Sequence, residues 1–420
     1  MDYDIIIIGA GPAGYSASLE AASRGMKTAL MEKSVKNLGG VCLNRGCIPF
    51  KGFLYYSRYE NDYSKIKEKV MQRISGIREG LKKRLLSKKI EIIEGEAVLK
   101  GKNEVECGGK TYTAENILIT SGSSSKNIIK SPLVFLSDKI FDLDKLPSKV
   151  VLAGGGVIGC EFATFLNNLG CEVVVVELTD GLLPGVDKEA VRALSREFKK
   201  KKIKVVTGST ISDIKEGAAV IKTGEKENEE KCDAVFEVIG RQPEASKPGL
   251  ESAGVKADEK GFVVTDENYR TSAGNIYAAG DCINTPMLAY TAMHEGEAAI
   301  KNIAGEKTKK PDYSLIPFLT YSSPEVGYIG KTKGGTVYKY FFRAVGKAVV
   351  EGNESGFLRL HEEGGVITGA VVVGEEITEL MNELAVIVKN RMRAKDILST
   401  MHVHPSYSEI IPDALRYGKQ

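Results

Sequence analysis

Two cysteines with the spacing of a redox pair lie near the start of the chain. Cys42 and Cys47 are separated by four residues in the stretch 40–51, which has glycines before and between them and Lys51 just beyond. In a chain without secretory features, such a pair is typical of thiol–disulfide cycling or metal binding, and less so of a structural staple. A zinc site would need further cysteine or histidine pairs at ligand spacing, and none accompanies this pair. We therefore predict a thiol–disulfide switch and no metal site.

A histidine and a glutamate near the other end of the chain could transfer protons. His404 is followed five residues later by Glu409, a pattern that fits an imidazole oriented by a carboxylate. A structural or surface histidine is the commoner origin of such a pattern. The pair by itself therefore leaves both interpretations open.

A glycine-rich turn after a buried strand indicates a cofactor site. Residues 3–8 form a β-branched apolar run, followed by Gly9, Gly11 and Gly14, a helical stretch and a second strand that ends on Glu32. Glycines let the backbone approach a pyrophosphate, which binds the N–H groups at the helix N-terminus. Glu32 lies 18 residues past Gly14, where an acid accepts hydrogen bonds from a ribose. The pattern predicts a dinucleotide-binding unit rather than a purely structural turn.

The same pattern recurs in the middle of the chain. A strand over 150–153 leads into Gly154, Gly156 and Gly159, and the next strand ends on Glu177, again 18 residues past the last motif glycine. We therefore predict two dinucleotide-binding units in two domains. No Arg or Lys directly follows Glu177. A carboxylate there favours a free 2′-hydroxyl over a 2′-phosphate, so the second cofactor is expected to be NAD rather than NADP.

Two later stretches contribute further candidate contacts. Residues 232–241 are typical of the closing strand and turn of the second unit and include Gly240. Residues 271–282 form a strand that ends in Gly280 and Asp281. An Asp at the carboxyl end of a parallel strand can bind a sugar-like hydroxyl of a cofactor, although it can equally cap the following helix.

Length and charge place these motifs in a multi-domain globular protein. The chain has 420 residues and a net charge of +3, and no apolar run reaches the roughly 18 residues of a membrane span. The basic runs 82–84 and 199–202 lie in helix-like stretches, where solvated helix faces are expected rather than a nucleic-acid site. We therefore expect a cytoplasmic protein with no membrane span and no nucleic-acid partner.

The remaining stretches show helix, strand and loop patterns. A charged helix is expected over 60–90, a loop-like linker over 123–148 and a helix with an apolar stripe over 376–391. Residues 336–350 and 356–373 are expected to form antiparallel strands.

These elements predict an α/β fold with two Rossmann-like domains and a C-terminal α+β domain. The expected domains are a first cofactor domain (1–147), a second cofactor domain (148–270), a return to the first (271–311) and the C-terminal domain (312–420).

With these pieces placed, the sequence resembles the flavin-dependent pyridine nucleotide–disulfide oxidoreductases from residue 4 to about 415. The resemblance rests on the stretches 9–15, 42–49, 276–281 and 404–409. The order Cys-Leu-Asn-Arg-Gly-Cys is most similar to the dihydrolipoamide dehydrogenase branch. The resemblance implies that the first unit binds FAD and the second NAD, and that the C-terminal domain forms a homodimer.

The resemblance also implies roles for the two chemical pairs. Cys42 would be the interchange thiol that the substrate attacks, and Cys47 would lie next to the flavin. His404, held by Glu409, would deprotonate a dithiol substrate and would serve the disulfide of the partner subunit.

Further residues match the family's cofactor contacts. Lys51 resembles the lysine near the flavin, Glu161 matches the glutamate that pairs with it, and Ala289 lies in the frame of a cofactor-binding helix. A solvent-facing lysine and a first-turn helix acid are the alternatives for the first two. Four residues depart from the family pattern, which puts the redox potential and the substrate channel in doubt: Val41, Phe50, Tyr290 and Thr291.

The function implied is oxidation of protein-bound dihydrolipoamide with NAD⁺. The partner would be a lipoylated carrier of a 2-oxoacid dehydrogenase or glycine-cleavage system. The alternatives are an NAD(P)H-dependent reductase of another disulfide, such as a coenzyme A disulfide or a small thiol, and a redox-sensing flavoprotein with low turnover.

Overall fold

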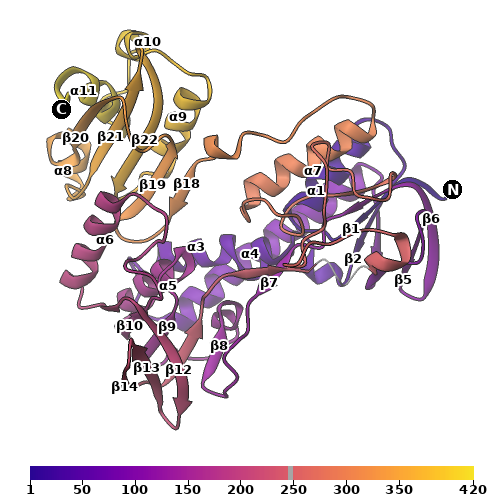
Figure 1. Cartoon of the computed structure of the whole chain (residues 1–420), viewed down its shortest axis with the longest axis horizontal. Helices are drawn as coiled ribbons and strands as arrows, with labels where there is room; N and C mark the ends of the chain where they lie inside the picture. Colours follow the sequence, from indigo (N-terminus) through magenta and orange to yellow (C-terminus); the bar gives the residue numbers. More distant parts are fainter. Residues whose placement is uncertain (245–248) are drawn as a thin grey trace. The chain divides into compact units, whose positions relative to one another are not determined.

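The computed structural model describes residues 1–244 and 249–420, which form two compact units (Figure 1). Unit 1 comprises residues 1–126 and 241–311, and unit 2 comprises residues 127–240 and 312–420.

A mostly parallel sheet forms the centre of unit 1. Strands β3, β2, β1 and β6 lie in that order, β17 pairs with β6 in parallel, and β5 and β4 extend the sheet antiparallel from β6. The strands are β1 (Tyr3–Ile8), β2 (Thr28–Glu32), β3 (Glu91–Glu94), β4 (Ala97–Leu99), β5 (Glu104–Cys107), β6 (Lys110–Ile119) and β17 (Ile276–Ala278). The β-branched run of β1 is buried on both faces, as predicted for a central parallel strand.

Helices α1 (Pro12–Ser23) and α7 (Ala289–Ile303) pack against each other in unit 1 (Figure 1). Gly296 permits this packing, because a Cβ at that position would lie 2.3 Å from the backbone oxygen of Ala13. Since α1 begins directly after β1, its N-terminus lies at the carboxyl edge of the parallel strands.

The redox stretch forms two consecutive short helices, α2 (Gly40–Arg45) and α3 (Cys47–Tyr56), followed by the long helix α4 (Tyr63–Ser87). The helix predicted over 60–90 is thus confirmed. Helix α3 packs on α4 through Gly52, whose Cβ would lie 3.0 Å from the Val70 side chain, and through an edge contact between the rings of Phe53 and Tyr63 at 5.8 Å.

Unit 2 contains a second parallel sheet, in the order β11, β10, β9, β15, β8. Helix α5 (Val157–Asn168) joins β9 to β10, as the repeated motif predicts, and helix α6 (Lys188–Lys200) precedes β11. An antiparallel three-stranded sheet, β12 to β14, lies between β11 and β15 in the sequence. The strands are β8 (Val134–Leu136), β9 (Lys149–Ala153), β10 (Glu172–Val176), β11 (Lys204–Val206), β12 (Ser209–Lys215), β13 (Ala218–Thr223), β14 (Lys226–Lys231) and β15 (Ala234–Glu237).

The C-terminal part of unit 2 is an antiparallel sheet with helices, coloured orange to yellow in Figure 1. Its strands lie in the order β18, β19, β22, β21, β20, and its buried residues form one apolar cluster with the helices. The elements are β18 (Phe318–Thr320), β19 (Glu325–Gly330), β20 (Thr336–Phe341), α8 (Gly346–Val350), β21 (Phe357–Glu363), β22 (Val366–Gly374), α9 (Thr378–Lys389), α10 (Ala394–Ser399) and α11 (Ile410–Tyr417).

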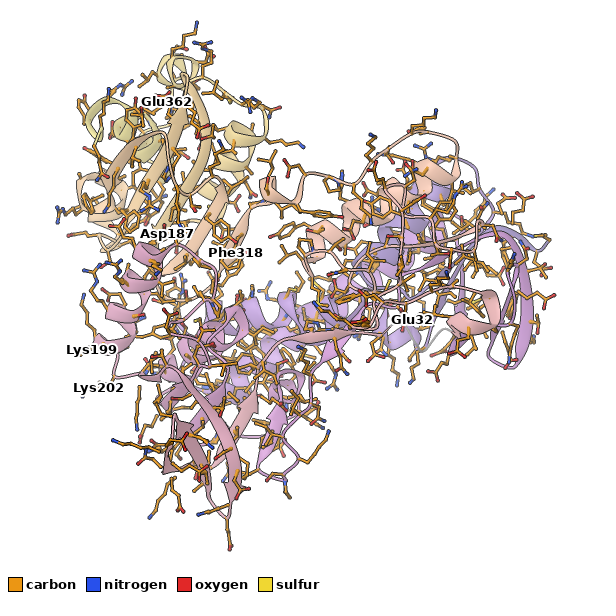
Figure 2. All side chains as sticks on the ribbon, viewed as in Figure 1. Glu32, Asp187, Lys199, Lys202, Phe318 and Glu362 are labelled. Atoms are coloured by element: carbon orange, nitrogen blue, oxygen red, sulfur yellow. The ribbon has the colours of Figure 1, made fainter. Side chains whose placement is uncertain are left out.

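Within unit 2, ion pairs join α6 to this antiparallel sheet. The guanidinium of Arg359 on β21 lies 2.5 Å from Asp187, the N-cap of α6, and 2.7 Å from Glu189; Asp187 is labelled in Figure 2. Lys339 on β20 also bonds Glu189. Because Arg359 and Asp187 are largely buried, removing one partner would leave a desolvated charge.

The expected linker over 123–148 is wrong in part, because this segment contains β7 (Ser123–Ser125) and β8. Strand β7 pairs antiparallel with β16 (Arg241–Pro243) in unit 1, whereas β8 pairs in parallel with β15 in unit 2. Residues 127–147 belong to unit 2, and the domain boundaries expected after 147 and 270 stay a prediction.

The strand expected over 336–350 ends early. Its second half forms α8, because the chain turns at Phe342–Ala344 and then follows a helical path to Val350. The strands over 356–373 and the helix over 376–391 are confirmed as β21, β22 and α9.

The predictions about charged and apolar stretches can also be compared with the structure. Lys199 and Lys202 are exposed at the end of α6, as expected for a solvated helix face (Figure 2). Among residues 1–244 and 249–420, none of the helices combines the length and the hydropathy needed to cross a membrane.

Candidate redox and dinucleotide sites

The two predicted redox cysteines lie in contact at the junction of α2 and α3. Cys42 is in α2, Cys47 is the first residue of α3, and both are thiols in the structure. A hydrogen bond with Cys47, and then burial, raise the pKa of the Cys42 thiol, while the charge of Lys51 acts in the opposite direction. Cys47 is exposed and Cys42 is half-buried. The pair is therefore placed for thiol–disulfide exchange.

A turn at Gly46 brings the two helices together. A Cβ there would lie 2.9 Å from the Val41 backbone oxygen, so the turn leaves little room for a side chain. Lys51 lies one helical turn after Cys47 on α3, so it shares that face of the helix.

A buried asparagine between the two cysteines stabilises the redox stretch through hydrogen bonds. The Nδ2 atom of Asn44 donates to the backbone oxygens of Leu38 at 3.0 Å and Gly40 at 2.8 Å. Its Oδ1 accepts a hydrogen bond of 2.9 Å from Nη1 of Arg78 on α4. Sequence reasoning did not single out this pair; the position of Asn44 inside the motif was its only signal, and Arg78 carried none.

The first glycine motif forms the predicted turn at the start of α1. Gly9 has a φ of +101°, and a Cβ on Gly14 would lie 1.8 Å from the Gly9 backbone oxygen. Gly11 is the N-cap of α1, and a Cβ there would meet nothing within 4 Å. Gly9 and Gly14 are thus required by the fold, whereas Gly11 leaves open space beside the first N–H groups of the helix.

Glu32 closes this turn from the end of β2. Its Oε2 accepts a hydrogen bond of 2.8 Å from the N–H of Ala10. Burial raises the pKa of Glu32, although backbone hydrogen bonds oppose the effect. The carboxyl, labelled in Figure 2, is therefore held beside the glycine turn, as a ribose contact requires.

The second motif repeats this geometry. Gly154 has a φ of +114°, a Cβ on Gly159 would lie 2.0 Å from the Gly154 oxygen, and Gly156 is the open N-cap of α5. Glu177 follows β10 and accepts hydrogen bonds from Gly155 N–H at 2.6 Å through Oε2 and from Thr179 through Oε1. Gly240, after β15, has a φ of +111°.

Gly280 and Asp281 follow β17 in unit 1. Gly280 has a φ of +76°, and its N–H donates to the buried carboxylate of Glu295 on α7 at 2.9 Å. Oδ2 of Asp281 accepts a hydrogen bond of 2.6 Å from the Ser123 hydroxyl. Ala289 is the first residue of α7.

The residues of unit 1 fit an FAD. Glu32 ends β2, and Gly11 and Asp281 follow β1 and β17; the carboxyl ends of these parallel strands share one edge of the sheet. The open N-terminus of α1 suits a pyrophosphate and the two carboxylates suit hydroxyl groups. The residues of unit 2 fit a second dinucleotide by the same argument.

The predicted proton-transfer pair is formed in unit 2. Nδ1 of His404 lies 2.8 Å from Oε1 of Glu409, and Oε2 of Glu409 accepts a hydrogen bond of 2.8 Å from the Ser406 N–H. The hydrogen bond with His404, and then that from Ser406, lower the pKa of Glu409. The His404 side chain is 79% exposed, so its Nε2 is available to a substrate.

The predicted partners Lys51 and Glu161 belong to different units. Lys51 lies on α3 of unit 1, whereas Glu161 is buried on α5 of unit 2, where its Oε1 accepts a hydrogen bond of 3.2 Å from Tyr321 N–H. Their pairing stays a prediction.

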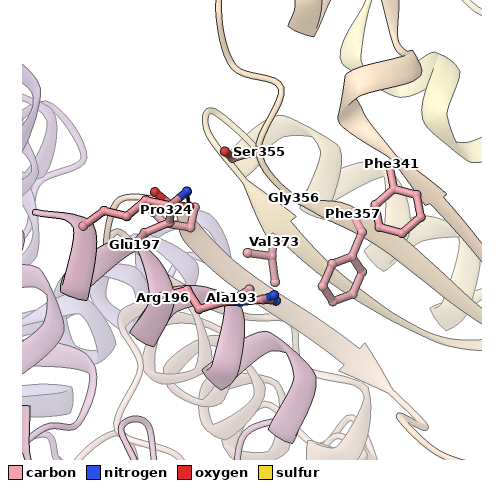
Figure 3. Close-up of a pocket in the computed structure, with 10 residues that line it drawn as sticks. Ala193, Arg196, Glu197, Pro324, Phe341, Ser355, Gly356, Phe357 and Val373 are labelled. Carbon is pink, nitrogen blue, oxygen red and sulfur yellow. Dashed lines mark hydrogen bonds and ion pairs between the residues drawn. The ribbon is translucent and has the colours of Figure 1, made fainter.

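Two of the pockets in unit 2 are lined by residues of its C-terminal part. One lies between α6 and the antiparallel sheet, and its lining residues include Arg196, Phe341 and Phe357 but none of the predicted site residues (Figure 3). The other lies between α8 and the His404–Pro405 bond. The second pocket is therefore the one beside the predicted proton-transfer pair.

Comparison with known proteins shows a consistent set of relatives. Residues 3–296 match the family model described as pyridine nucleotide-disulphide oxidoreductase, and residues 316–415 match that of its dimerisation domain. The dihydrolipoyl dehydrogenase of Chlamydia pneumoniae is 34% identical over 442 aligned positions, which cover 97% of this chain and 95% of the relative. The dihydrolipoyl dehydrogenase of Bacillus subtilis is also 34% identical and covers 99% and 96%.

Solved structures have the same fold. The HOCl-induced flavoprotein disulfide reductase RclA from Escherichia coli matches with a TM-score of 0.92 at 24% identity, over 99% of this chain and all of that chain. At this identity the match shows the fold alone. LpdA from Mycobacterium tuberculosis matches with a TM-score of 0.89 at 25% identity, over 98% of each chain. The predicted fold class, two dinucleotide-binding domains with a C-terminal dimerisation domain, is confirmed.

Proposed function

The chain belongs to the pyridine nucleotide-disulphide oxidoreductase family, and we propose that within it the protein oxidises protein-bound dihydrolipoamide with NAD⁺. It is an FAD-dependent oxidoreductase that uses NAD(H), as the sequence predicts. The observation that carries the proposal is the contact between Cys42 and Cys47 at the junction of α2 and α3. The identity of the curated relatives supports dihydrolipoamide as the dithiol.

The proposed exchange begins with the cysteines as a disulfide. Nε2 of His404 takes the proton from one substrate thiol, and the thiolate attacks the Cys42 sulfur. The Cys42–Cys47 bond breaks and Cys47 leaves as a thiolate. The second substrate thiol then displaces Cys42, which yields the oxidised substrate and the reduced cysteine pair. The side-chain hydrogen bond between Cys42 and Cys47 supports this exchange, because it brings the two thiols into contact.

An FAD held in unit 1 would carry the two electrons of the dithiol to NAD⁺ as a hydride. We assign it to Gly9, Gly11, Gly14 and Glu32 with Asp281. Lys51 and Ala289 lie at helix positions suited to the same cofactor, and Glu161 is proposed as the partner of Lys51. The corresponding NAD site comprises Gly154, Gly156, Gly159, Glu177 and Gly240.

A homodimer and a lipoylated carrier complete the proposal. The match of residues 316–415 to the dimerisation domain supports a homodimer. In that dimer His404 would serve the cysteine pair of the partner subunit. The carrier would belong to a 2-oxoacid dehydrogenase or glycine-cleavage system, which the curated relatives' activity supports.

The test is NAD⁺ reduction by the FAD-loaded protein with dihydrolipoamide, beside a panel of other dithiols and monothiols. Fast turnover selective for dihydrolipoamide supports the proposal. Weak turnover, with the flavin still bleached by NADH, would instead identify a reductase of another disulfide, such as a coenzyme A disulfide. Cys42→Ser and Cys47→Ser are each expected to abolish the dithiol reaction, and turnover at the wild-type rate in either would contradict the disulfide mechanism.

A further inference from the structure

Three polar side chains in unit 1 form a chain of hydrogen bonds that ends on Asp281. Nε of Arg241 lies 2.7 Å from the Ser123 hydroxyl oxygen, and Nη2 of Arg241 lies 2.5 Å from the Ser123 backbone oxygen. The Ser123 hydroxyl lies 2.6 Å from Oδ2 of Asp281. Arg241 itself approaches Asp281 only to 4.0 Å.

The direction of each hydrogen bond follows from the donors available. A guanidinium only donates, and a serine hydroxyl has one proton. Because Arg241 donates to the Ser123 oxygen, the single Ser123 proton is available for Asp281. Oδ2 of Asp281 is thereby occupied, and among the described residues none donates a hydrogen bond to Oδ1.

The backbone holds this arrangement in place. Strands β7 and β16 form a two-stranded antiparallel ribbon in which Arg241 pairs with Ser125 and Pro243 pairs with Ser123. Ser123 is 8% exposed, and the side chains of Arg241 and Asp281 are 21% and 23% exposed. The hydrogen bonds are therefore shielded enough to orient the carboxylate, since their strength rises where water is excluded.

We infer that Ser123 and Arg241 are positioning residues for Asp281, which present its Oδ1 as a fixed acceptor for a hydroxyl group of the FAD side chain. This inference rests on the assignment of Asp281 to FAD in the proposed function. The ribbon that carries it lies directly at the boundaries 126/127 and 240/241 of the two units. The chain leaves unit 1 after residue 126 and returns to it at residue 241, so both crossings adjoin this ribbon in the sequence.

Ser124 offers a matched control on the same strand. It pairs through its backbone with Gln242, and its side chain makes no hydrogen bond to the other described residues. Ser124→Ala therefore removes a hydroxyl from the same ribbon without touching Asp281.

The test is a double-mutant cycle on FAD affinity, with apoprotein reconstituted with FAD and followed by flavin fluorescence. Ser123→Ala is expected to raise the Kd for FAD about tenfold, the effect of losing one hydrogen bond to a charged group. In the Asp281→Asn background, Ser123→Ala should alter the Kd for FAD by less than about threefold. The reason is that Asp281→Asn has already removed the carboxylate through which Ser123 acts. Ser124→Ala should leave the Kd at the wild-type value.

Arg241→Lys provides a second variant if Ser123→Ala fails to fold, which thermal unfolding of the apoprotein would reveal. It keeps the charge but loses the planar fork, so its effect on the Kd should also shrink in the Asp281→Asn background. Independent, additive effects of Ser123 or Arg241 and Asp281 would overturn the inference. No effect of Asp281→Asn would overturn both the inference and the assignment of Asp281. The cycle uses FAD without any dithiol, so a failure of the dihydrolipoamide assay leaves its result interpretable.

Discussion

Glu409 holds the imidazole of His404 at 2.8 Å while its second carboxylate oxygen is fixed by the Ser406 backbone. The carboxylate therefore has one oxygen committed to its own loop and one to the histidine. Such an arrangement fixes the ring orientation and leaves Nε2 to exchange a proton.

Replacing this carboxylate should slow the reaction with the dithiol. Glu409→Gln keeps the size of the side chain but removes the charge that stabilises a protonated His404. We expect kcat to fall about 100-fold, within the range for a disturbed general base. The measurement is NAD⁺ reduction with dihydrolipoamide. Glu383→Gln is the matched control, because Glu383 faces the neighbouring His402 at 3.1 Å; an equal loss in both variants would contradict a specific role for Glu409.

The lowered pKa of Glu409 also predicts a pH-dependent stability difference. The group's folded-state pKa lies below its ordinary 4.5, so the carboxylate stabilises the folded protein above that pH, and the contribution is lost as pH falls through the folded value. Wild type should thus exceed Glu409→Gln in unfolding free energy at pH 7, and the difference should shrink below pH 4.5. Urea unfolding at several pH values measures it. A difference in unfolding free energy that grows as the pH falls would contradict the stabilising role of the Glu409 carboxylate.

The two thiols of the reduced, FAD-free protein should react in a definite order. Cys47 is exposed, whereas a hydrogen bond with Cys47 and burial raise the pKa of Cys42. Since the thiolate is the nucleophile, iodoacetamide should label Cys47 first. Peptide mass spectrometry after short exposures reads the order. With FAD bound, the rate at Cys47 should fall relative to that at Cys42; an unchanged ratio would contradict the placement of Cys47 beside the flavin.

Two glycines of the first motif are expected to differ in role, Gly14 being needed for folding and Gly11 for cofactor binding. Gly14→Ala places a Cβ 1.8 Å from the Gly9 oxygen, so it should lower the apoprotein unfolding midpoint by at least about 5 °C. Gly11→Ala meets nothing within 4 Å. It should leave the midpoint unchanged yet raise the Kd for FAD about tenfold, because the added methyl occupies the approach to the helix N-terminus. Wild-type FAD affinity in Gly11→Ala would refute this use of the turn.

The carboxylate of Glu177 predicts the choice of nicotinamide cofactor. It is buried and already bonded to Gly155 and Thr179, so a 2′-phosphate beside it would face a fixed negative charge. We expect kcat/KM for NAD⁺ to exceed that for NADP⁺ at least about tenfold. Steady-state kinetics with NAD⁺ and NADP⁺ as acceptors measure this ratio. A preference for NADP⁺ would contradict the role assigned to Glu177.

Much of the fold was accessible from local patterns. The runs before Gly9 and Gly154 became β1 and β9, and these two glycines adopt the positive φ of the turn that follows each strand, +101° and +114°. These predictions succeed because strand burial and glycine conformations depend on a few consecutive residues.

The errors lie where pairing partners are far apart in the sequence. Strands β7 and β8 have three residues each, too few to show a periodicity, and they exist because they pair with β16 and β15 more than 90 residues away. Helix α8 was mistaken for a strand because its short apolar run fits either structure.

Residue types and spacings along the chain were enough to find the segments that hold the cysteine pair, the two glycine motifs with their carboxylates and the His404–Glu409 pair. The geometry within each of these segments is local, and the roles of the residues stay predictions. The contacts of Arg78 with Asn44 and of Arg241 with Ser123 join segments that are 34 and 118 residues apart. No sequence pattern marks such contacts, because the closing of the intervening chain is driven by burial of the whole core rather than by the two residues that meet.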